Sequence, residues 1–264
     1  MDLQLKNKTA LVTGSTVGIG LATASLLARE GAAVVINGRS QRRIDEAVEQ
    51  IRREHEGARV KGVAADLGAK EGFELLASVV PAIDILVNNL GIYEKKPFTE
   101  ISDEDWLRIY EVNVLSGVRL SRFYLPKMLE KNSGRIVFIS SESALQIPMD
   151  MIHYGVTKTA LIALARGLAE MTAGTGVTVN SVLPGPTLSE GVERIVQDLA
   201  KSLATDVEAA KKEFFRSIRP TSLLKRFSTP QEVAAMVVYV CSPLASSTNG
   251  AALRVDGGVV RSIV

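Results

Sequence analysis

The sequence predicts an α/β fold with one parallel sheet covered by helices on both faces, and three observations support this. Short β-branched runs recur, and each is almost continuously apolar, as strands covered on both faces should be. Segments of helical period lie between them, which implies the right-handed crossovers of a doubly wound sheet. A glycine-rich turn follows the first run. The expected strands are residues 9 to 13, 32 to 37, 58 to 65, 83 to 88, 134 to 140, 177 to 183 and 251 to 256.

The segments between the strands have the 3.6-residue period of helices that pack one face on a sheet. Ser102 is expected to cap a helix, with Asp105 three residues on as an imperfect capping box. Thr229 followed by Pro230 is a second such start. Residues 188 to 226 break the rhythm with two amphipathic patterns, which indicates a lid inserted into a single domain. The expected helices are residues 18 to 30, 41 to 55, 102 to 130, 153 to 172 and 230 to 241.

Composition excludes several classes of protein. Lysine and arginine total 31 against 29 acidic residues, and a net charge of +2 provides no broad field for a nucleic-acid backbone. The single cysteine, Cys241, lies in an apolar run and is expected to be a buried structural thiol. No apolar segment reaches the roughly 18 residues of a membrane span. We therefore expect a cytoplasmic protein with neither a nucleic-acid nor a membrane partner.

The turn after the first strand, "TGSTVGIG", favours a bound dinucleotide. Glycines at 14, 18 and 20 allow the turn to close, allow a phosphate to approach the backbone, and allow the helix to pack closely on the strand. Amides at the helix N-terminus then attract the pyrophosphate. The alternative is an ordinary tight turn between a strand and a helix. The expected contacts from this turn are Gly14, Ser15, Thr16, Gly18, Ile19 and Gly20.

The ends of the next two strands bear on which cofactor is bound. An acidic residue for the adenosine ribose is missing after the second strand, where Gly38 leaves space and Arg39 offers a fork suited to a 2′-phosphate. NADP(H) is therefore preferred, with NAD(H) as the alternative, and Ser40 is expected to lie beside the same phosphate. A solvated basic turn would explain the same residues. Asp66, with Leu67 after it, is expected at the adenine edge, unless it simply caps a helix.

"YGVTK" places Tyr154 and Lys158 four residues apart in a predicted helix, and therefore on one face. A tyrosine titrates near about 10, and a nearby fixed cation lowers that pKa. Such a phenol can exchange a proton with an alcohol or carbonyl oxygen. A chance spacing is the alternative. Ser141, thirteen residues before Tyr154, ends a predicted strand and can donate to a carbonyl oxygen, and this spacing selects it over Ser140.

These motifs resemble the compact single-domain branch of the short-chain dehydrogenases/reductases, including its 3-oxoacyl-acyl-carrier-protein reductase-like oxidoreductases. "TGSTVGIG", "NNLG", "EVNVLSG", "YGVTK", "LPGPT" and "NGAALRVDGG" occur in the family's order and span nearly the whole chain. The resemblance implies a Rossmann-type fold and a nicotinamide cofactor. It also implies a catalytic tetrad of Asn113, Ser141, Tyr154 and Lys158. Leu90 replaces the family's usual alanine in "NNLG" and is expected to narrow the cofactor or substrate edge.

The resemblance also implies a role for each residue. Tyr154 protonates the carbonyl oxygen while hydride arrives from the nicotinamide, and Ser141 holds that oxygen. Lys158 sustains the lowered pKa of the tyrosine and binds the ribose, and Asn113 holds a water that links Lys158 to solvent. Thr187 meets the carboxamide, although it is also a good helix cap. The cofactor contacts expected in this half of the chain are Asn89, Gly91, Tyr154, Lys158, Pro184, Gly185 and Thr187.

Apolar residues around Tyr154 and in the lid favour a secondary alcohol and its ketone, 3-oxoacyl substrates included. The expected wall comprises Leu145, Ile147, Met149, Met151 and Ile152. The lid adds Leu188, Val192, Ile195, Val196, Phe214 and Phe215, most of which are expected to face the core. His153 is expected to be a packing histidine with its ring satisfied, and His55 a solvated helix end, so no metal is assigned. The resemblance implies a homotetramer or homodimer. A catalytically silent nucleotide-sensing protein is the alternative function.

Overall fold

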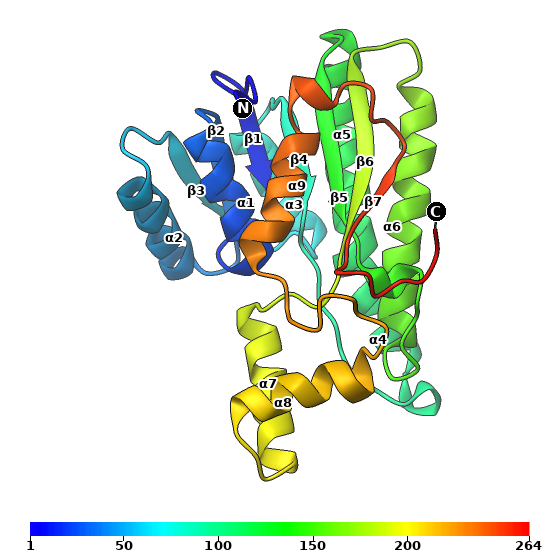
Figure 1. Cartoon of the computed structure of the whole chain (residues 1–264). Helices are drawn as coiled ribbons and strands as arrows, with labels where there is room; N and C mark the ends of the chain where they lie inside the picture. The colour runs from blue at the N-terminus through cyan, green and yellow to red at the C-terminus, as the bar shows by residue number, and fades with distance from the viewer. Residues whose placement is uncertain (264) are drawn as a thin grey trace.

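The computed structural model describes residues 1–263, and a seven-stranded parallel sheet forms its centre (Figure 1). The strand order is β3-β2-β1-β4-β5-β6-β7. Successive strands are therefore added toward one edge of the sheet up to β3 and toward the other edge from β4 onward, and the switch point lies between β1 and β4. Ligands bind such sheets at the carboxyl ends of the strands beside this switch point. The strands are β1 Thr9–Val12, β2 Ala33–Gly38, β3 Val60–Ala64, β4 Ile85–Asn88, β5 Gly134–Ile139, β6 Val177–Pro184 and β7 Ala252–Val255.

Helices cover both faces of the sheet and bury two apolar clusters against it. One cluster joins α1 (Gly18–Arg29), α2 (Gln41–Glu54) and α9 (Pro230–Val240) to the sheet. The other joins α3 (Lys70–Val79), α5 (Ser116–Glu130) and α6 (Ile152–Met171) to the opposite face. This arrangement is the predicted doubly wound, Rossmann-type α/β fold, and all seven expected strands are present within two residues of their predicted ends.

The predicted helix over residues 102 to 130 is not continuous. It consists of α4 (Asp103–Tyr110), a π-helical turn over Glu111–Leu115, and α5. A π-helical turn holds one extra residue against the α-helical repeat, so an apolar period read from the sequence does not reveal it. Helix α3 lies outside the expected helices. Short 3₁₀ turns occupy Phe98–Glu100, Glu142–Ala144 and Pro243–Ala245.

Both predicted helix starts are confirmed by their hydrogen bonds. The Ser102 hydroxyl accepts from the Asp105 amide at 3.2 Å, and the Asp105 carboxylate accepts from the Ser102 amide in return. Thr229 forms the same reciprocal capping box with Glu232, with Pro230 in the first turn. The capping box at Ser102 was expected to be imperfect, but the Asp105 carboxylate reaches the Ser102 amide and completes it.

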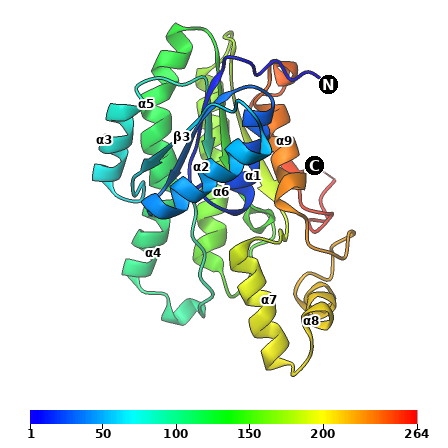
Figure 2. The same ribbon diagram turned by 90° about the vertical axis from the view of Figure 1, so that its left-hand side faces the viewer.

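Residues 188 to 226 project from the body as a separate arm, visible from two directions (Figures 1 and 2). The arm contains α7 (Glu190–Ser202), α8 (Val207–Glu213) and a π-helical turn over Phe214–Ile218. Its apolar cluster comprises Val196, Ala200, Ala210, Phe214 and Phe215, together with Phe227 of the chain that follows the arm. We call residues 188 to 226 the arm from here on. No helix within residues 1–263 is both long and apolar enough to cross a lipid bilayer.

Candidate active site

A cavity of about 260 Å³ opens at the carboxyl ends of the strands, between the body and the arm. Its base comes from the chain after β4, the end of β5, the start of α6 and the chain after β6. Of the predicted site residues, it brings together Ile19, Asn89, Gly91, Ser141, Tyr154, Lys158, Pro184, Gly185 and Thr187. Residues from five separate segments therefore meet at one place, as expected beside the switch point of the sheet.

The glycine turn after β1 has the backbone that a dinucleotide site needs. Gly14 and Gly18 have φ of 56° and 60°, in the left-handed region that favours glycine. A Cβ on Gly20 would lie 2.5 Å from both the Asn89 amide nitrogen and the Gly14 oxygen. Helix α1 starts at Gly18, the residue before it, Val17, provides no capping side chain, and the first turn carries no acidic residue. Its first amides are therefore free of competing side chains and suit a phosphate.

Buried hydrogen bonds fix the shape of this turn. The Ser15 hydroxyl donates to the Val12 oxygen at 2.6 Å and accepts from the Asn37 amide, so it serves the turn itself. The Asn89 side chain donates to the oxygens of Thr13 and Gly14, both at 2.9 Å. Asn89 therefore ties the turn after β1 to the end of β4 as well as bordering the cavity.

The residues expected around the adenosine lie outside the cavity. Arg39 and Ser40 are exposed, and across residues 1–263 no hydrogen bond or ion pair engages the Arg39 guanidinium. Thr16 faces the end of β2, where a Cβ on Gly38 would lie 2.7 Å from its methyl group. The Asp66 carboxylate accepts from the Gly68 amide at 3.0 Å, which makes a local turn and not the helix cap considered as the alternative. Leu67, expected beside the cofactor, is buried in the core and is 1% exposed.

The two serines at the end of β5 have different partners. The Ser140 hydroxyl donates to the backbone oxygen of Lys158 at 2.7 Å and so fastens α6 to the sheet. The Ser141 hydroxyl lines the cavity, donates to the Glu142 carboxylate at 2.7 Å and accepts from the Ser143 amide at 3.1 Å. These contacts place Ser141 and not Ser140 at the cavity, as the spacing to Tyr154 predicts.

Tyr154 and Lys158 project from the first turns of α6 on one face, as predicted from their spacing. The Lys158 ammonium lies 5.6 Å from the centre of the Tyr154 ring and donates to the Ile139 oxygen at 2.9 Å. The Tyr93 ring, from the chain after β4, meets the Tyr154 ring edge to face at 6.2 Å. A Cβ on Gly91 would lie 3.2 Å from the Lys158 nitrogen, so glycine keeps the space beside the ammonium open.

The expected lowering of the Tyr154 pKa is wrong in this structure. Burial raises the pKa of the Tyr154 phenol above its usual value, and its hydrogen bond with Ser141 opposes this only in part. Lys158 is not among the groups that shift that pKa, and burial lowers the pKa of its own ammonium to about 8. Desolvation acts against both charged forms at once, and the sequence spacing does not reveal it.

Asn113 lies in the π-helical turn, and its side chain is fully occupied by the protein. Its amide oxygen accepts from the Ile92 amide at 2.7 Å, and its nitrogen donates to the Ile92 oxygen and the Thr157 hydroxyl, both at 2.9 Å. Thr157 is part of α6, so Asn113 connects the chain after β4 to the helix that carries Tyr154 and Lys158. The predicted water beside Asn113 stays a prediction.

Thr187 follows the turn after β6 and does not cap the arm helix, which was its alternative role. Helix α7 begins at Glu190 after Ser189, and the Thr187 hydroxyl donates to the Gly185 oxygen at 2.9 Å. An isolated parallel bridge between Thr187 and Ser228 closes the base of the arm.

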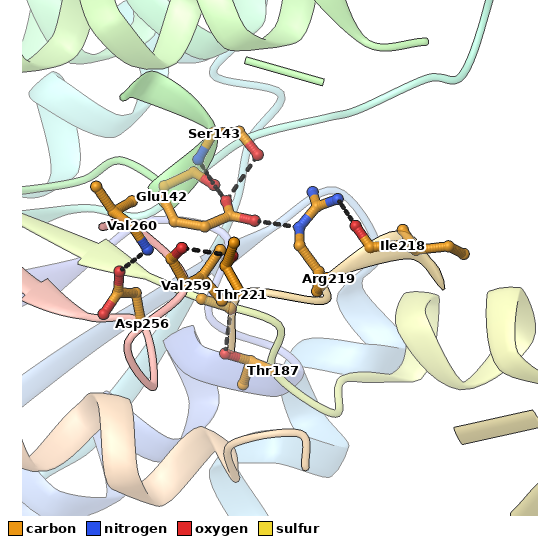
Figure 3. A network of polar contacts seen from close by, with 11 residues as sticks. Glu142, Ser143, Thr187, Ile218, Arg219, Thr221, Asp256, Val259 and Val260 are labelled. Atoms are coloured by element: carbon orange, nitrogen blue, oxygen red, sulfur yellow. Dashed lines mark hydrogen bonds and ion pairs between the residues drawn. The ribbon is translucent and has the colours of Figure 1, made fainter. Parts of the chain in front are cut away.

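Three residues that were not predicted complete the site. The Glu142 carboxylate is buried beside Ser141 and pairs with the Arg219 guanidinium of the arm, Nε to Oε1, at 2.8 Å (Figure 3). Tyr93 lines the cavity opposite them. An acidic residue directly after the site serine was the one available signal for Glu142. Arg219 is 77 residues away and had no signal.

The apolar wall predicted just before Tyr154 is mostly wrong, whereas Val192, Ile195 and Phe214 of the predicted lid do line the cavity. Leu145, Ile147 and Met149 are 49%, 45% and 88% exposed and do not line the cavity, and neither does Ile152. Leu145, Ile147 and Met149 belong to the chain that precedes α6, which begins at Ile152. Leu90 packs against the core and does not line this cavity, and its expected narrowing of the cofactor edge stays a prediction. The apolar lining comes chiefly from Ile19, Ile139, Met151, Val192, Ile195, Phe214, Ile218 and Phe227.

Neither histidine belongs to the cavity. His153 is fully buried against Trp106, ring centres 5.9 Å apart, but both its ring nitrogens lack a hydrogen-bond partner within the described residues, contrary to the satisfied histidine expected. His55 is not simply solvated, because its ring nitrogen bonds the Ser25 hydroxyl at 2.8 Å. Over residues 1–263, no group of three or more His, Cys, Asp or Glu side chains is placed to hold a metal ion.

The chain is similar to known proteins in both sequence and structure. The family model described as short chain dehydrogenase matches residues 8–200. The uncharacterized oxidoreductase YvaG of Bacillus subtilis is 49% identical over 100% of both chains. The 3-oxoacyl-acyl-carrier-protein reductase FabG of Aquifex aeolicus is 36% identical over 98% of this chain and 100% of that protein. The crystal structure of L-sorbose reductase from Gluconobacter frateurii, complexed with NADPH and L-sorbose, has a TM-score of 0.93 at 33% identity and covers 100% of each chain.

Proposed function

The chain belongs to the short-chain dehydrogenase family, and from that premise we propose that it is an NADP(H)-preferring reductase of ketones, or dehydrogenase of the matching secondary alcohols. One observation carries the proposal. Ser141, Tyr154 and Lys158 converge at the base of one cavity that also reaches Ile19 of the glycine turn. A proton donor and an oxygen-binding hydroxyl therefore stand beside a turn suited to a dinucleotide phosphate.

The residues of the turn and the cavity fit a nicotinamide dinucleotide. We assign the pyrophosphate to the Gly14, Gly18 and Gly20 turn, because its helix amides are uncapped and a side chain at Gly20 would collide. The cofactor supplies hydride when bound. Asn89, Gly91, Lys158, Pro184, Gly185 and Thr187 are assigned to its nicotinamide half, since they line the cavity beside Tyr154.

In the proposed reaction Tyr154 gives its phenolic proton to the carbonyl oxygen as hydride reaches the carbonyl carbon. Burial raises the pKa of Tyr154, so at neutral pH the phenol carries the proton that the reduction consumes. Ser141 holds the same oxygen, and Asn113 fixes α6 through Thr157. Holding the reacting carbons in near-attack geometry lowers the barrier by up to about 7 to 11 kcal/mol.

The preference for NADP(H) rests on Arg39. Its guanidinium is exposed at the end of β2, free of ion pairs within residues 1–263, and no carboxylate takes the place of a ribose ligand there. A free guanidinium fork suits a phosphate. The NADPH in the L-sorbose reductase complex supports the same preference.

We also propose a cytoplasmic homotetramer or homodimer that forms through α5 and α6. Small residues on α6 support this. Thr159, Ala163 and Gly167 are exposed, and a Cβ on Gly167 would meet nothing within 4 Å, whereas Gly155 and Ala169 are used inside the subunit. Light scattering on the active protein measures the assembly, and an active monomer would refute it.

The first test of function is binding followed by turnover. NADPH and NADH are titrated separately by nicotinamide fluorescence, and a ketone panel is then added to whichever binds. We expect tight NADPH binding and ketone-dependent oxidation. Binding without turnover on any ketone would favour the nucleotide-sensing alternative, and absence of binding would refute both.

A further inference from the structure

A buried carboxylate lies directly beside the proposed oxygen-binding serine. Glu142 is 4% exposed, lines the cavity, and belongs to the short 3₁₀ turn that follows β5. Its Oε2 accepts two hydroxyl hydrogens, from Ser141 and from Ser143, each at 2.7 Å. Its Oε1 accepts from Arg219 Nε (Figure 3). All its contacts are therefore donors, as an enclosed carboxylate requires.

Arg219 fixes the orientation of this carboxylate. Its side chain is 16% exposed, and a second nitrogen donates to the Ile218 oxygen at 3.1 Å. Because Arg219 holds Oε1, the other oxygen, Oε2, is kept on the side of the two serines. Lys95 and Asp150 also line the cavity, but they pair with each other at 3.4 Å and make no contact with Glu142.

The proposed reaction conflicts with one of these hydrogen bonds. A serine hydroxyl has a single hydrogen, and Ser141 gives it to Glu142. When Ser141 turns that hydrogen to a carbonyl oxygen, Glu142 loses one of its donors. A buried acceptor left without its donor is costly, so a substrate that returns a donor at this point is favoured over one that does not.

We propose that the site selects ketones that carry a hydroxyl on the carbon next to the carbonyl, and that Glu142 recognises this hydroxyl by accepting its hydrogen bond. The carbonyl oxygen takes the hydrogen of Ser141, and the neighbouring hydroxyl replaces Ser141 as a donor to Glu142 Oε2. The reaction itself is the one proposed above, on which this inference rests: hydride adds to the carbonyl carbon, and Tyr154 gives its proton to the oxygen.

The test uses two ketones that differ by one group, 1-hydroxy-2-propanone and 2-butanone, in which a methyl replaces the hydroxyl. With saturating reduced coenzyme, we expect kcat/KM to be about tenfold to a hundredfold higher for the hydroxyketone. In Glu142→Gln, Arg219 still takes the oxygen of the side chain, which places the amide NH₂, a donor, where Oε2 stood. We expect this variant to bring the ratio close to one, chiefly by slowing the hydroxyketone.

Asp150→Asn is the matched control, because it removes a carboxylate from the same cavity without touching the serines, and its ratio should stay at the wild-type value. The double variant Glu142→Met with Arg219→Met removes both charges together and should also abolish the preference. Coenzyme titration reports whether each variant is folded.

Equal rates of the wild type on both ketones would overturn the inference and leave the proposed reductase intact. An equal fall on both ketones in Glu142→Gln would show that Glu142 only positions Ser141, and would also overturn it. Failure of the wild type to oxidise coenzyme with any ketone would instead overturn the proposed function, and this inference with it.

Discussion

The body and the arm hold their parts of the cavity in different ways. In the body, Ser141, Tyr154 and Lys158 extend from strand ends and a helix that share two large apolar clusters with the sheet. The arm packs around one small cluster that includes three phenylalanines. The chemistry therefore lies on the more extensively packed part, and the arm contributes apolar wall and one charge, Arg219.

Several polar contacts join the two parts. The Thr221 hydroxyl donates to the Val259 oxygen at 2.6 Å, the Leu223 and Leu224 amides donate to the Gly257 oxygen, and Arg226 pairs with Glu232. Arg219 meets the buried Glu142, and Arg43 of α2 meets Glu190 of α7 at 3.4 Å on the surface. The arm packs closely on the chain after β4, where a Cβ on Gly191 would lie 2.5 Å from the Tyr93 hydroxyl. The difference teaches that changes in the body should alter turnover or global stability, and that changes in the arm should alter substrate binding.

The largest effect is expected from Tyr154→Phe, which removes the proton donor of the body and keeps the ring. Turnover should fall by about 10² to 10⁴, the usual contribution of general acid catalysis. Coenzyme binding should be retained, since the glycine turn is untouched. Steady-state rates and a fluorescence titration measure the two properties, and undiminished turnover would remove Tyr154 from the mechanism.

A pair of buried phenylalanines compares the two parts directly. Phe138 in β5 is fully buried, and Phe215 in the arm is 3% exposed. Replacing either by alanine creates a cavity that costs about 3 to 5 kcal/mol. We expect Phe138→Ala to lower the global free energy of unfolding by that amount. Phe215→Ala should instead raise KM for ketone and speed amide exchange in the arm. Equal global losses would show that body and arm unfold as one unit.

Lys158 makes stability depend on pH. Its folded pKa of about 8 is below the unfolded value, so between about pH 8 and 10.5 the unfolded state binds more protons and stability rises with pH. Relative to Lys158→Met, the wild type should gain up to about 1.4 kcal/mol per pH unit across that window. Denaturant unfolding of both proteins at several pH values measures this, and parallel curves would contradict the buried cation.

Arg39→Ala tests the coenzyme preference at the outer end of the body. Loss of a charge-assisted contact to phosphate should weaken NADPH binding by about tenfold to a hundredfold and leave NADH unchanged. Arg42→Ala is the matched control, because Arg42 pairs with Glu46 in the same basic turn. Equal weakening of both coenzymes would refute the role of Arg39.

The smallest effect is expected from Arg43→Gln, which breaks the surface ion pair between α2 and the arm. Both side chains are more than 40% exposed, so the pair should contribute no more than about 1 kcal/mol. Melting temperature and KM should hardly move. A large rise in KM would mean that this contact positions the arm, and that α2 of the body also contributes to substrate binding.

Local sequence patterns were sufficient to predict the fold of the body but not to predict its contact with the arm. Apolar runs located every strand, and the glycine turn and "YGVTK" located most of the cavity base. The Glu142 to Arg219 pair was missed because it joins side chains far apart in sequence. The pKa of Tyr154 was misjudged because burial depends on packing that no spacing records. The unpartnered ring of His153 is a further consequence of packing.

The π-helical turn at Glu111–Leu115 has a consequence for how this chain tolerates changes in length. A π-helical turn is equivalent to one residue inserted into an α-helix. Deleting a single codon there would let α4 run straight into α5 as one α-helix, but it would remove the widened turn in which Asn113 lies. The Asn113 side chain would then leave Ile92 and Thr157. Insertions in the arm should be tolerated far better than this one deletion.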